Sequence, residues 1–324
     1  MELPSLERIR EAQSIVYRQM PPTPQYSWPL VNLRLGNGTA ADVWIKHENH
    51  GPVGAFKLRG ALVYMDWLKK SEPGLAGVVA ATRGNHGQGV GMAARLAGLH
   101  AVIVVPHGNS ADKNRAMVAQ GVELVEHGQD FQESLEFASL LAAERGYSMV
   151  DSFHERLVMG TATYAMEFFE GAPGLDVVFV PIGLGSSISG VAAARNALGL
   201  KTKIIGVVAA QSPSYSLSFK ETKIVEAPSR TAIADGLACR TPNPQAMEAI
   251  WKNVERIVKV RDDEIADAMR AIYDDTHNLA EGAGAAAFAG AFKEKASHAG
   301  KRIGIVLTGG NVDRQIYAET LVGK

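Results

Sequence analysis

Eight short runs of β-branched and aliphatic residues recur along the chain, and most are apolar at consecutive rather than alternate positions. Such runs are typical of strands that a parallel sheet buries on both faces. Between them lie segments with apolar residues three and four positions apart, which indicate helices. Strands are expected at Asp42–Lys46, Gly77–Ala81, Ala101–Val105, Val122–Val125, Val177–Val180, Lys203–Val208, Arg256–Val260 and Ile303–Leu307. Strand–helix alternation of this length predicts an α/β fold with right-handed crossovers.

The chain has 324 residues, about twice the usual length of one domain, so two domains are expected. The spacing of the runs predicts two open, twisted, mostly parallel sheets flanked by helices. Residues 76–151 are expected to form a small domain, and residues 1–75 and 152–324 a large one. No linker rich in Pro, Gly or Ser marks the boundary.

Composition excludes several classes of partner. The chain has 33 Lys and Arg against 34 Asp and Glu, and this balance predicts no nucleic-acid partner and no anionic membrane partner. No apolar run is long enough to span a bilayer, and the N-terminal residues lack the apolar core of a secretory signal. The single cysteine, Cys239, excludes an intramolecular disulfide and suits a reducing compartment. We expect a cytoplasmic protein.

A glycine-rich loop follows the run at Val177–Val180 and opens a helical pattern. Its glycines would let the backbone approach a ligand, and the free amides of a helix N-terminus attract phosphate. Besides a phosphate site, two other interpretations of this loop are open. A lone Gly-x-Gly is more often a simple tight turn, and it also occurs in dinucleotide sites. A dinucleotide site expects an acid at the end of the next strand. Residues 204–211 contain no acid, so a single phosphate fits better. The loop residues are Gly183, Leu184, Gly185, Ser186 and Ser187.

Three further loops follow strand-like runs and carry polar groups. Residues 82–88 hold two glycines and polar side chains at a helix start, which suits a carboxylate, although a capping or buried histidine is the simpler interpretation of His86. Lys57 stands between Phe56 and Leu58, where apolar surroundings would lower the pKa of its amine, although most such lysines are solvated. Thr308 begins a turn whose hydroxyl could face a ligand.

In this order, the four loops resemble those of fold-type II pyridoxal-phosphate enzymes, the tryptophan synthase β-like fold, and most of all the serine/threonine dehydratase and serine racemase branch. The resemblance runs from about Thr23 to Asp313. It implies that Lys57, in the stretch Gly54–Gly60, bonds to pyridoxal 5′-phosphate. It also implies that the glycine-rich loop holds the phosphate and that Thr308 lies beside the pyridine nitrogen. Further expected cofactor contacts are Phe56, Asn85, Gly236 and Glu281, and expected substrate contacts are Thr82, Arg83, Asn85 and His86.

The resemblance implies a lyase that removes water from an L-β-hydroxy amino acid and releases a 2-oxo acid and ammonia. Lys57 would remove the Cα proton, and the cofactor would act as an electron sink. The expected substrates are L-threonine and L-serine, or a bulkier analogue such as phenylserine. An amino-acid racemase or another β-eliminating lyase is the alternative. A nicotinamide-dependent oxidoreductase and a non-catalytic ligand sensor are weaker ones. Members of the family are commonly homodimers.

Three departures from the family pattern matter. Arg83 stands where the racemase branch has a serine, and because an arginine stays protonated it is a poor proton acceptor. Residues 208–214 lack the carboxylates that hold a divalent cation in that branch, so no metal is expected. Residues 152–156 replace the usual substrate loop.

The chain ends soon after Asp313, so by the resemblance an unregulated, catabolic enzyme is expected, with Lys57 and Arg83 as its catalytic residues.

Overall fold

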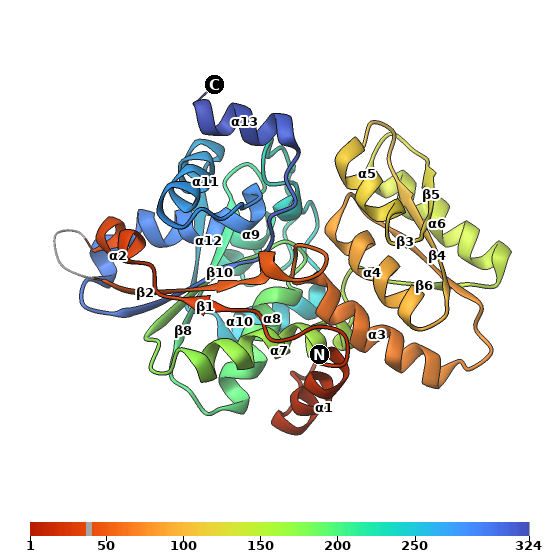
Figure 1. Cartoon of the computed structure of the whole chain (residues 1–324), viewed down its shortest axis with the longest axis horizontal. Coiled ribbons are helices and arrows are strands. Elements are labelled where there is room, and N and C mark those ends of the chain that lie inside the picture. Colours follow the sequence, from red (N-terminus) through yellow and green to blue (C-terminus); the bar gives the residue numbers. More distant parts are fainter. Residues whose placement is uncertain (37–40, 324) are drawn as a thin grey trace.

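The computed structural model describes residues 1–36 and 41–323 (Figure 1). Its strands form two separate sheets. The larger has the order β1-β2-β10-β7-β8-β9, and the smaller has the order β5-β4-β3-β6. All neighbouring strands in the described residues run parallel except β1 and β2. The strands are β1 (Gln25–Tyr26), β2 (Asp42–His47), β3 (Gly77–Ala81), β4 (His100–Val105), β5 (Glu123–Glu126), β6 (Ser148–Met149), β7 (Val177–Pro181), β8 (Lys203–Ala209), β9 (Arg256–Val260) and β10 (Arg302–Leu307).

Helices cover both sheets (Figure 1). They are α1 (Leu6–Val16), α2 (Pro29–Leu35), α3 (Lys57–Ser71), α4 (Asn85–Leu96), α5 (Ala111–Val118), α6 (Phe131–Arg145), α7 (Glu155–Gly171), α8 (Ser186–Ala197), α9 (Ser214–Glu221), α10 (Pro244–Asn253), α11 (Asp262–Thr276), α12 (Gly282–Lys293) and α13 (Arg314–Val322). Three short 3-10 helices are also described: η1 (Glu48–His50), η2 (Asp235–Leu237) and η3 (Lys295–His298). The alternation of strands and helices confirms the predicted α/β fold.

Strand β7 shows why consecutive residues are apolar. Val177 and Phe179 pack into the hydrophobic core on one face of the large sheet, whereas Val178 and Val180 pack into the core on the other face. All four side chains are buried. A strand covered by helices on both faces needs apolar side chains at every position, which the sequence pattern predicts.

The predicted strand boundaries agree closely with the structure. Strands β3 and β9 have the predicted bounds, and the other six predicted strands differ by a single residue at one or both ends. Strands β1 and β6 were not predicted, because two residues give no periodic pattern. In the described part of the chain, no helix combines the length and apolar character that crossing a membrane requires.

The small sheet is built from segments within residues 77–149, but helix α3 also packs against it. Leu58 and Leu62 of α3 share a hydrophobic core with Val78 and Ala80 of β3. In Figure 1 this helix extends from the large sheet along the small one. The division into residues 76–151 and the remainder therefore stays a prediction, since one core crosses its first boundary.

Candidate active site

Two loops of the large sheet are joined through their backbones at the start of α3. The amide of Phe56 donates to the carbonyl oxygen of Thr308 at 3.1 Å, and the amide of Gly310 donates to that of Gly54 at 2.9 Å. Ala55 and Gly309 form an isolated β-bridge between these bonds. The loop that leads to Lys57 is thereby fixed to the turn that follows β10. The two segments are about 250 residues apart in sequence, and the structure brings them together.

Lys57 is the first residue of α3, and its side chain is partly buried. Its Nζ lies 4.9 Å from the centroid of the Phe56 ring. Burial lowers the pKa of the Lys57 amine to about 8, and the charge of Glu281 opposes this shift. Among the described residues, none accepts a hydrogen bond from the Lys57 amine. This amine therefore loses its proton more readily than an ordinary lysine and remains available for covalent or proton-transfer chemistry.

Asn85 and Glu281 lie in contact across the two sheets. Asn85 is the first residue of α4, and its Nδ2 donates to Oε1 of the buried Glu281 at 2.6 Å. The Nδ2 of Asn311 donates to Oδ1 of Asn85 at 2.7 Å and to the carbonyl oxygen of Val53 at 2.7 Å. Asn311 thus joins the Lys57 loop to Asn85. Asn311 was missed as a site residue, although it lies in the turn that the sequence singles out after Thr308.

Burial raises the pKa of the Glu281 carboxyl to about 7. Lys113, the hydrogen bond from Asn85 and Lys57 each oppose this rise, while Asp235 adds to it. A carboxyl with a pKa near neutrality changes charge in the range where enzymes work, and such groups gather at functional sites. Glu281 is therefore the candidate site's titratable acid.

The loop at residues 82–88 contains both buried and exposed groups. Thr82 is buried, and its hydroxyl accepts a hydrogen bond from the Gly84 amide at 3.2 Å. His86 is also buried, its Nε2 has no hydrogen-bond partner among the described residues, and burial followed by the charge of Lys57 lowers its pKa to about 3. A neutral imidazole with a free ring nitrogen suits a polar ligand. By contrast, the Arg83 side chain is exposed and makes no hydrogen bond or ion pair with another described residue, while its carbonyl oxygen accepts a bond from Asn109.

The glycine-rich loop surrounds the N-terminus of α8. Gly185 precedes this helix with φ of +96°, a conformation that favours glycine. A Cβ at Gly183 would overlap the carbonyl oxygen of Gly236, so both loops need close backbone approach. Ser186 and Ser187 are buried, and the Ser187 hydroxyl is 2.7 Å from the Tyr164 hydroxyl, whereas Leu184 is partly buried against the core. A helix N-terminus with close-packed backbone and buried hydroxyls is a suitable cradle for phosphate.

Further polar contacts join helix α5 to the large sheet. Lys113 forms an ion pair with Asp235, and Ser110 donates a hydrogen bond to Asp313. Lys113 also lies against Gly84, since a Cβ at that glycine would come 2.9 Å from its Cδ. The sequence did not single out Lys113, because a lysine in a polar helix has no distinctive local pattern.

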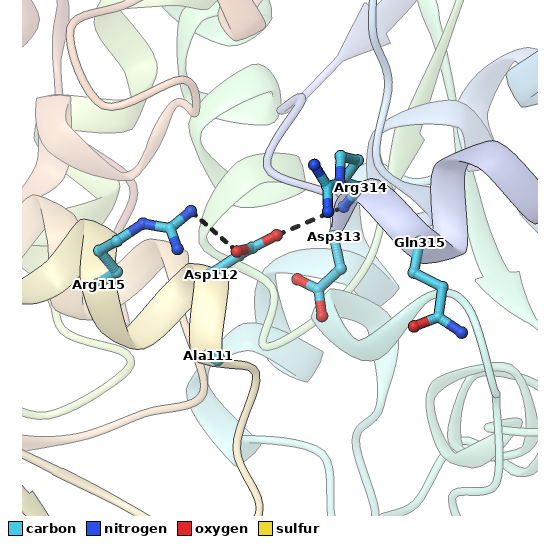
Figure 2. Close-up of a pocket in the computed structure, with 6 residues that line it drawn as sticks. All are labelled: Ala111, Asp112, Arg115, Asp313, Arg314 and Gln315. Atoms are coloured by element: carbon cyan, nitrogen blue, oxygen red, sulfur yellow. Dashed lines mark hydrogen bonds and ion pairs between the residues drawn. The ribbon is translucent and has the colours of Figure 1, made fainter.

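A cavity of about 400 Å³ lies beside these contacts, between α5 and the start of α13 (Figure 2). Its lining residues are Ala111, Asp112, Arg115, Asp313, Arg314 and Gln315. Asp112 bonds to both Arg115 and the Arg314 amide. None of the predicted site residues lines this cavity, so it is separate from the candidate active site. Within residues 1–36 and 41–323, no group of three or more His, Cys, Asp or Glu side chains could hold a metal ion.

The residues fit pyridoxal 5′-phosphate in three respects. The α8 N-terminus offers free amides for a phosphate, and the Lys57 amine has no hydrogen-bond or ion-pair partner among the described residues. The Thr308 side chain is buried, and no described residue hydrogen-bonds to its hydroxyl. Lys57 and Thr308 adjoin through the bond between Phe56 and Thr308, so a single ligand can meet both.

Comparison with known proteins agrees with this arrangement. The family model described as "Pyridoxal-phosphate dependent enzyme" matches residues 22–309. The chain belongs to the pyridoxal-phosphate dependent enzyme family.

Individual relatives narrow the family to its serine/threonine dehydratase branch. The chain is 34% identical to the L-threonine ammonia-lyase of Thermotoga maritima, covering 95% of this chain and 76% of the relative. It is 32% identical to the L-threo-3-hydroxyaspartate ammonia-lyase of Saccharomyces cerevisiae, covering 100% and 98%. The solved structure of maize serine racemase superposes with a TM-score of 0.91 at 28% identity, covering 99% and 98%. These matches confirm the predicted family, fold class, cofactor and lyase class, and the dinucleotide interpretation of Gly183 and Gly185 is set aside.

Proposed function

We propose that this protein is an ammonia-lyase that removes water from an L-β-hydroxy amino acid and releases a 2-oxo acid and ammonia. The observation that carries the proposal is Lys57: its amine has a lowered pKa and no hydrogen-bond or ion-pair partner within residues 1–36 and 41–323, and its loop is bonded to the Thr308 turn. The names of the ammonia-lyase relatives support the same reaction class. When bound, pyridoxal phosphate supplies an electron sink for charge that develops at Cα.

The proposed roles follow from where each side chain lies. Lys57 would hold the cofactor and would take the Cα proton of the substrate, which the lowered pKa of its amine favours. Thr308 would present a neutral hydroxyl to the pyridine nitrogen. Unlike a carboxylate, a hydroxyl would not hold that nitrogen protonated, which would favour prompt loss of a β-hydroxyl. The remaining cofactor contacts are proposed to be Phe56, Asn85, Gly183, Leu184, Gly185, Ser186, Ser187, Gly236 and Glu281.

The loop that begins at Thr82 is proposed to bind the substrate carboxylate. Asn85 and His86 open helix α4, and the free amides of a helix N-terminus favour a carboxylate. The free Nε2 of His86 supplies a further polar contact. Arg83 is proposed to meet the part of the substrate beyond Cα, because its guanidinium has no partner among the described side chains.

Elimination is proposed in preference to racemisation, although the maize serine racemase is a structural neighbour. Racemisation needs a second acid/base on the opposite side of Cα from Lys57. The residue at the corresponding loop position is Arg83, whose side chain stays protonated and cannot accept that proton. We further propose a homodimer, which analytical ultracentrifugation of the purified protein tests.

The substrate is proposed to be L-threonine, L-serine or a larger β-hydroxy amino acid. Phenylserine and 3-hydroxyaspartate represent the larger class, and the printed name of the yeast relative supports the second. Both offer Arg83 a suitable partner, since a guanidinium pairs with a carboxylate and stacks on an aromatic ring. Rates of ammonia release from these four amino acids would rank them.

The proposed function is tested with Lys57→Ala. We expect a folded protein without the visible absorbance of bound cofactor and with less than about a thousandth of the parental turnover. The matched control is Lys70→Ala, because Lys70 lies on the same helix but is exposed and forms a surface ion pair with Asp66. Turnover retained in Lys57→Ala, or lost in Lys70→Ala, would contradict the role of Lys57.

A further inference from the structure

Four charged side chains lie buried around the first turn of α3. This Arg59 cluster consists of Lys46, Glu48, Arg59 and Glu167, from β2, η1, α3 and α7 respectively. Lys46 and Arg59 are 0% exposed, and Glu48 is 1% exposed. The two cations balance the two carboxylates. None of the four takes part in the chemistry proposed above, yet Arg59 stands only two residues after Lys57.

Arg59 bonds to both carboxylates with a fork of donors. Its Nε and Nη2 donate to the two oxygens of Glu48 at 2.7 Å and 3.1 Å, and its Nη1 and Nη2 donate to those of Glu167 at 2.6 Å and 2.9 Å. The hydroxyls of Thr163 and Thr23 accept further bonds at 3.0 Å and 3.2 Å. Bidentate pairs of this kind fix direction as well as distance. Arg59 therefore holds α3 to three other segments at once.

Lys46 completes the cluster from the opposite side. Its Nζ donates to Glu167 Oε2 at 2.6 Å and to the carbonyl oxygen of Thr23 at 2.6 Å. The hydroxyl of Tyr17 donates to the other Glu167 oxygen at 3.0 Å. Both buried carboxylates thus have several donors, as a buried charge requires. In the part of the chain that the structure describes, no hydrogen bond or ion pair joins Lys46 directly to α3.

The backbone of the same helical turn is packed closely on its neighbours. A Cβ at Gly160 of α7 would overlap the carbonyl oxygen of Arg59. A Cβ at Gly89 of α4 would come 3.0 Å from the carbonyl carbon of Lys57. Backbone contact on two sides fixes where this turn lies. Phe56, which precedes the helix, makes no side-chain capping bond, and the start of the helix is restrained instead by the bond from the Phe56 amide to Thr308.

We propose that Arg59 is a positioning residue for Lys57, and that its bonds to Glu48 and Glu167 set the orientation from which the Lys57 amine reaches the reacting atoms. The proposal rests on the role proposed above for Lys57. Replacing buried ion pairs by apolar groups often leaves stability unchanged or raises it. Stability alone therefore does not account for four buried charges beside Lys57, whereas control of geometry does.

The test compares Arg59→Met with Lys46→Met in the cofactor-loaded protein. Each variant removes one buried cation from the Arg59 cluster. Arg59→Met also removes the hydrogen bonds that join α3 to Glu48 and Glu167, whereas Lys46→Met leaves those bonds in place. Both should lower the thermal unfolding midpoint. We expect Arg59→Met to lower kcat by roughly 10- to 100-fold with KM little changed, because a small misplacement of a reacting group is costly. Lys46→Met should keep kcat within about threefold of the parent.

Circular dichroism at the absorption band of the bound cofactor gives a second measurement that does not depend on turnover. It reports how the cofactor is held relative to the protein, so its intensity should change in Arg59→Met and not in Lys46→Met. Arg59→Lys keeps the positive charge but cannot form the bidentate hydrogen bonds to Glu48 and Glu167. If Arg59→Met does not fold, this variant carries the test, and a lowered kcat with an altered dichroism band is expected.

Two results would overturn the proposal. One is a kcat that falls equally in the Arg59 and Lys46 variants, in proportion to their unfolding midpoints. The other is a folded Arg59 variant with parental kcat and dichroism. Neither result resembles failure of the proposed function, which instead appears as retained turnover in Lys57→Ala.

Discussion

Lys57 and Asn85 belong to the same candidate site but are held in different ways. The Lys57 segment is fixed by backbone hydrogen bonds to the Thr308 turn and by the buried Arg59 cluster next to it. Asn85, at the start of α4, is held to the large sheet by side-chain bonds to Glu281 and Asn311. Lys113 and Asp235 add another side-chain contact between the two sheets.

This difference bears on how the two regions work. Backbone bonds and buried charges break only with local unfolding, whereas bonds between polar side chains exchange with water or with a ligand at lower cost. A base that takes a proton from Cα needs fixed geometry, while a loop that receives a substrate needs to be able to adjust. We therefore expect substitutions near Lys57 to act on the fold and on kcat, and those near Asn85 to act on substrate use.

The largest expected effect is that of Gly160→Val, which would break the packing behind Lys57. The added side chain would overlap the carbonyl of Arg59, and overpacking of this kind typically costs about 1–3 kcal/mol of unfolding free energy, occasionally more. Chemical denaturation measures the loss. The control is Gly74→Ala, because a Cβ added at Gly74 would meet no other described residue within 4 Å apart from its chain neighbours. Equal stability of the two variants would show that α3 is not closely packed at this crossing.

Arg83→Ala tests the adjustable side of the site. We expect kcat/KM for the preferred substrate to fall 10- to 100-fold, about 1.4–2.8 kcal/mol, because a charge-assisted contact to the substrate is lost. The fold should be unaffected, since the Arg83 side chain is exposed and unbonded among the described residues. Arg115→Ala serves as a control, because Arg115 is also exposed, lies on the nearby helix α5 and forms a surface ion pair with Asp112.

An unchanged kcat/KM in Arg83→Ala would place that side chain in solvent without a role. A fall confined to phenylserine or 3-hydroxyaspartate, with threonine unaffected, would identify Arg83 as a residue that selects the substrate side chain. A high rate of conversion of L-serine to D-serine by the parent protein would contradict the preference for elimination.

Glu281→Gln examines the contact that joins the two regions. Burial raises the pKa of this carboxyl from its usual 4.5 to about 7 in the folded protein, so ionisation opposes folding. The protonated Glu281 carboxyl therefore stabilises the folded protein. This contribution to the free energy of unfolding is fully present below pH 4.5, the pKa of the carboxyl in the unfolded chain, and is lost as the pH rises through about 7. In cofactor-free protein, the unfolding midpoint of the parent should therefore fall between about pH 5 and about pH 7 more steeply than that of Glu281→Gln. Parallel curves would show that this carboxyl is already ionised at pH 5.

Sequence patterns predicted the fold and the loops of this site because both depend on local features. Strand β7 is buried on both faces of its sheet, and its sequence accordingly has four consecutive apolar residues. Gly185 marks the start of a helix whose N-terminus suits a phosphate. The Arg59 cluster could not be predicted in the same way. Arg59 forms its ion pair with Glu167, which is 108 residues away in sequence, and Lys46 pairs with the same carboxylate across 121 residues. A charged residue in a strand or helix shows no sign of which distant partner will neutralise it, so such pairing emerges only in the folded chain.

The smallest expected effect is that of metal removal, and it concerns the region around β8 rather than either region compared above. Residues 208–214, at and just beyond the end of β8, contain no carboxylate, and hard divalent cations bind mainly through oxygen ligands of which carboxylates are the strongest. Dialysis against EDTA should therefore leave both kcat and the unfolding midpoint unchanged within error. The same treatment followed by added magnesium is the control. A loss that magnesium restores would contradict the prediction and show that another group of oxygen atoms binds a cation.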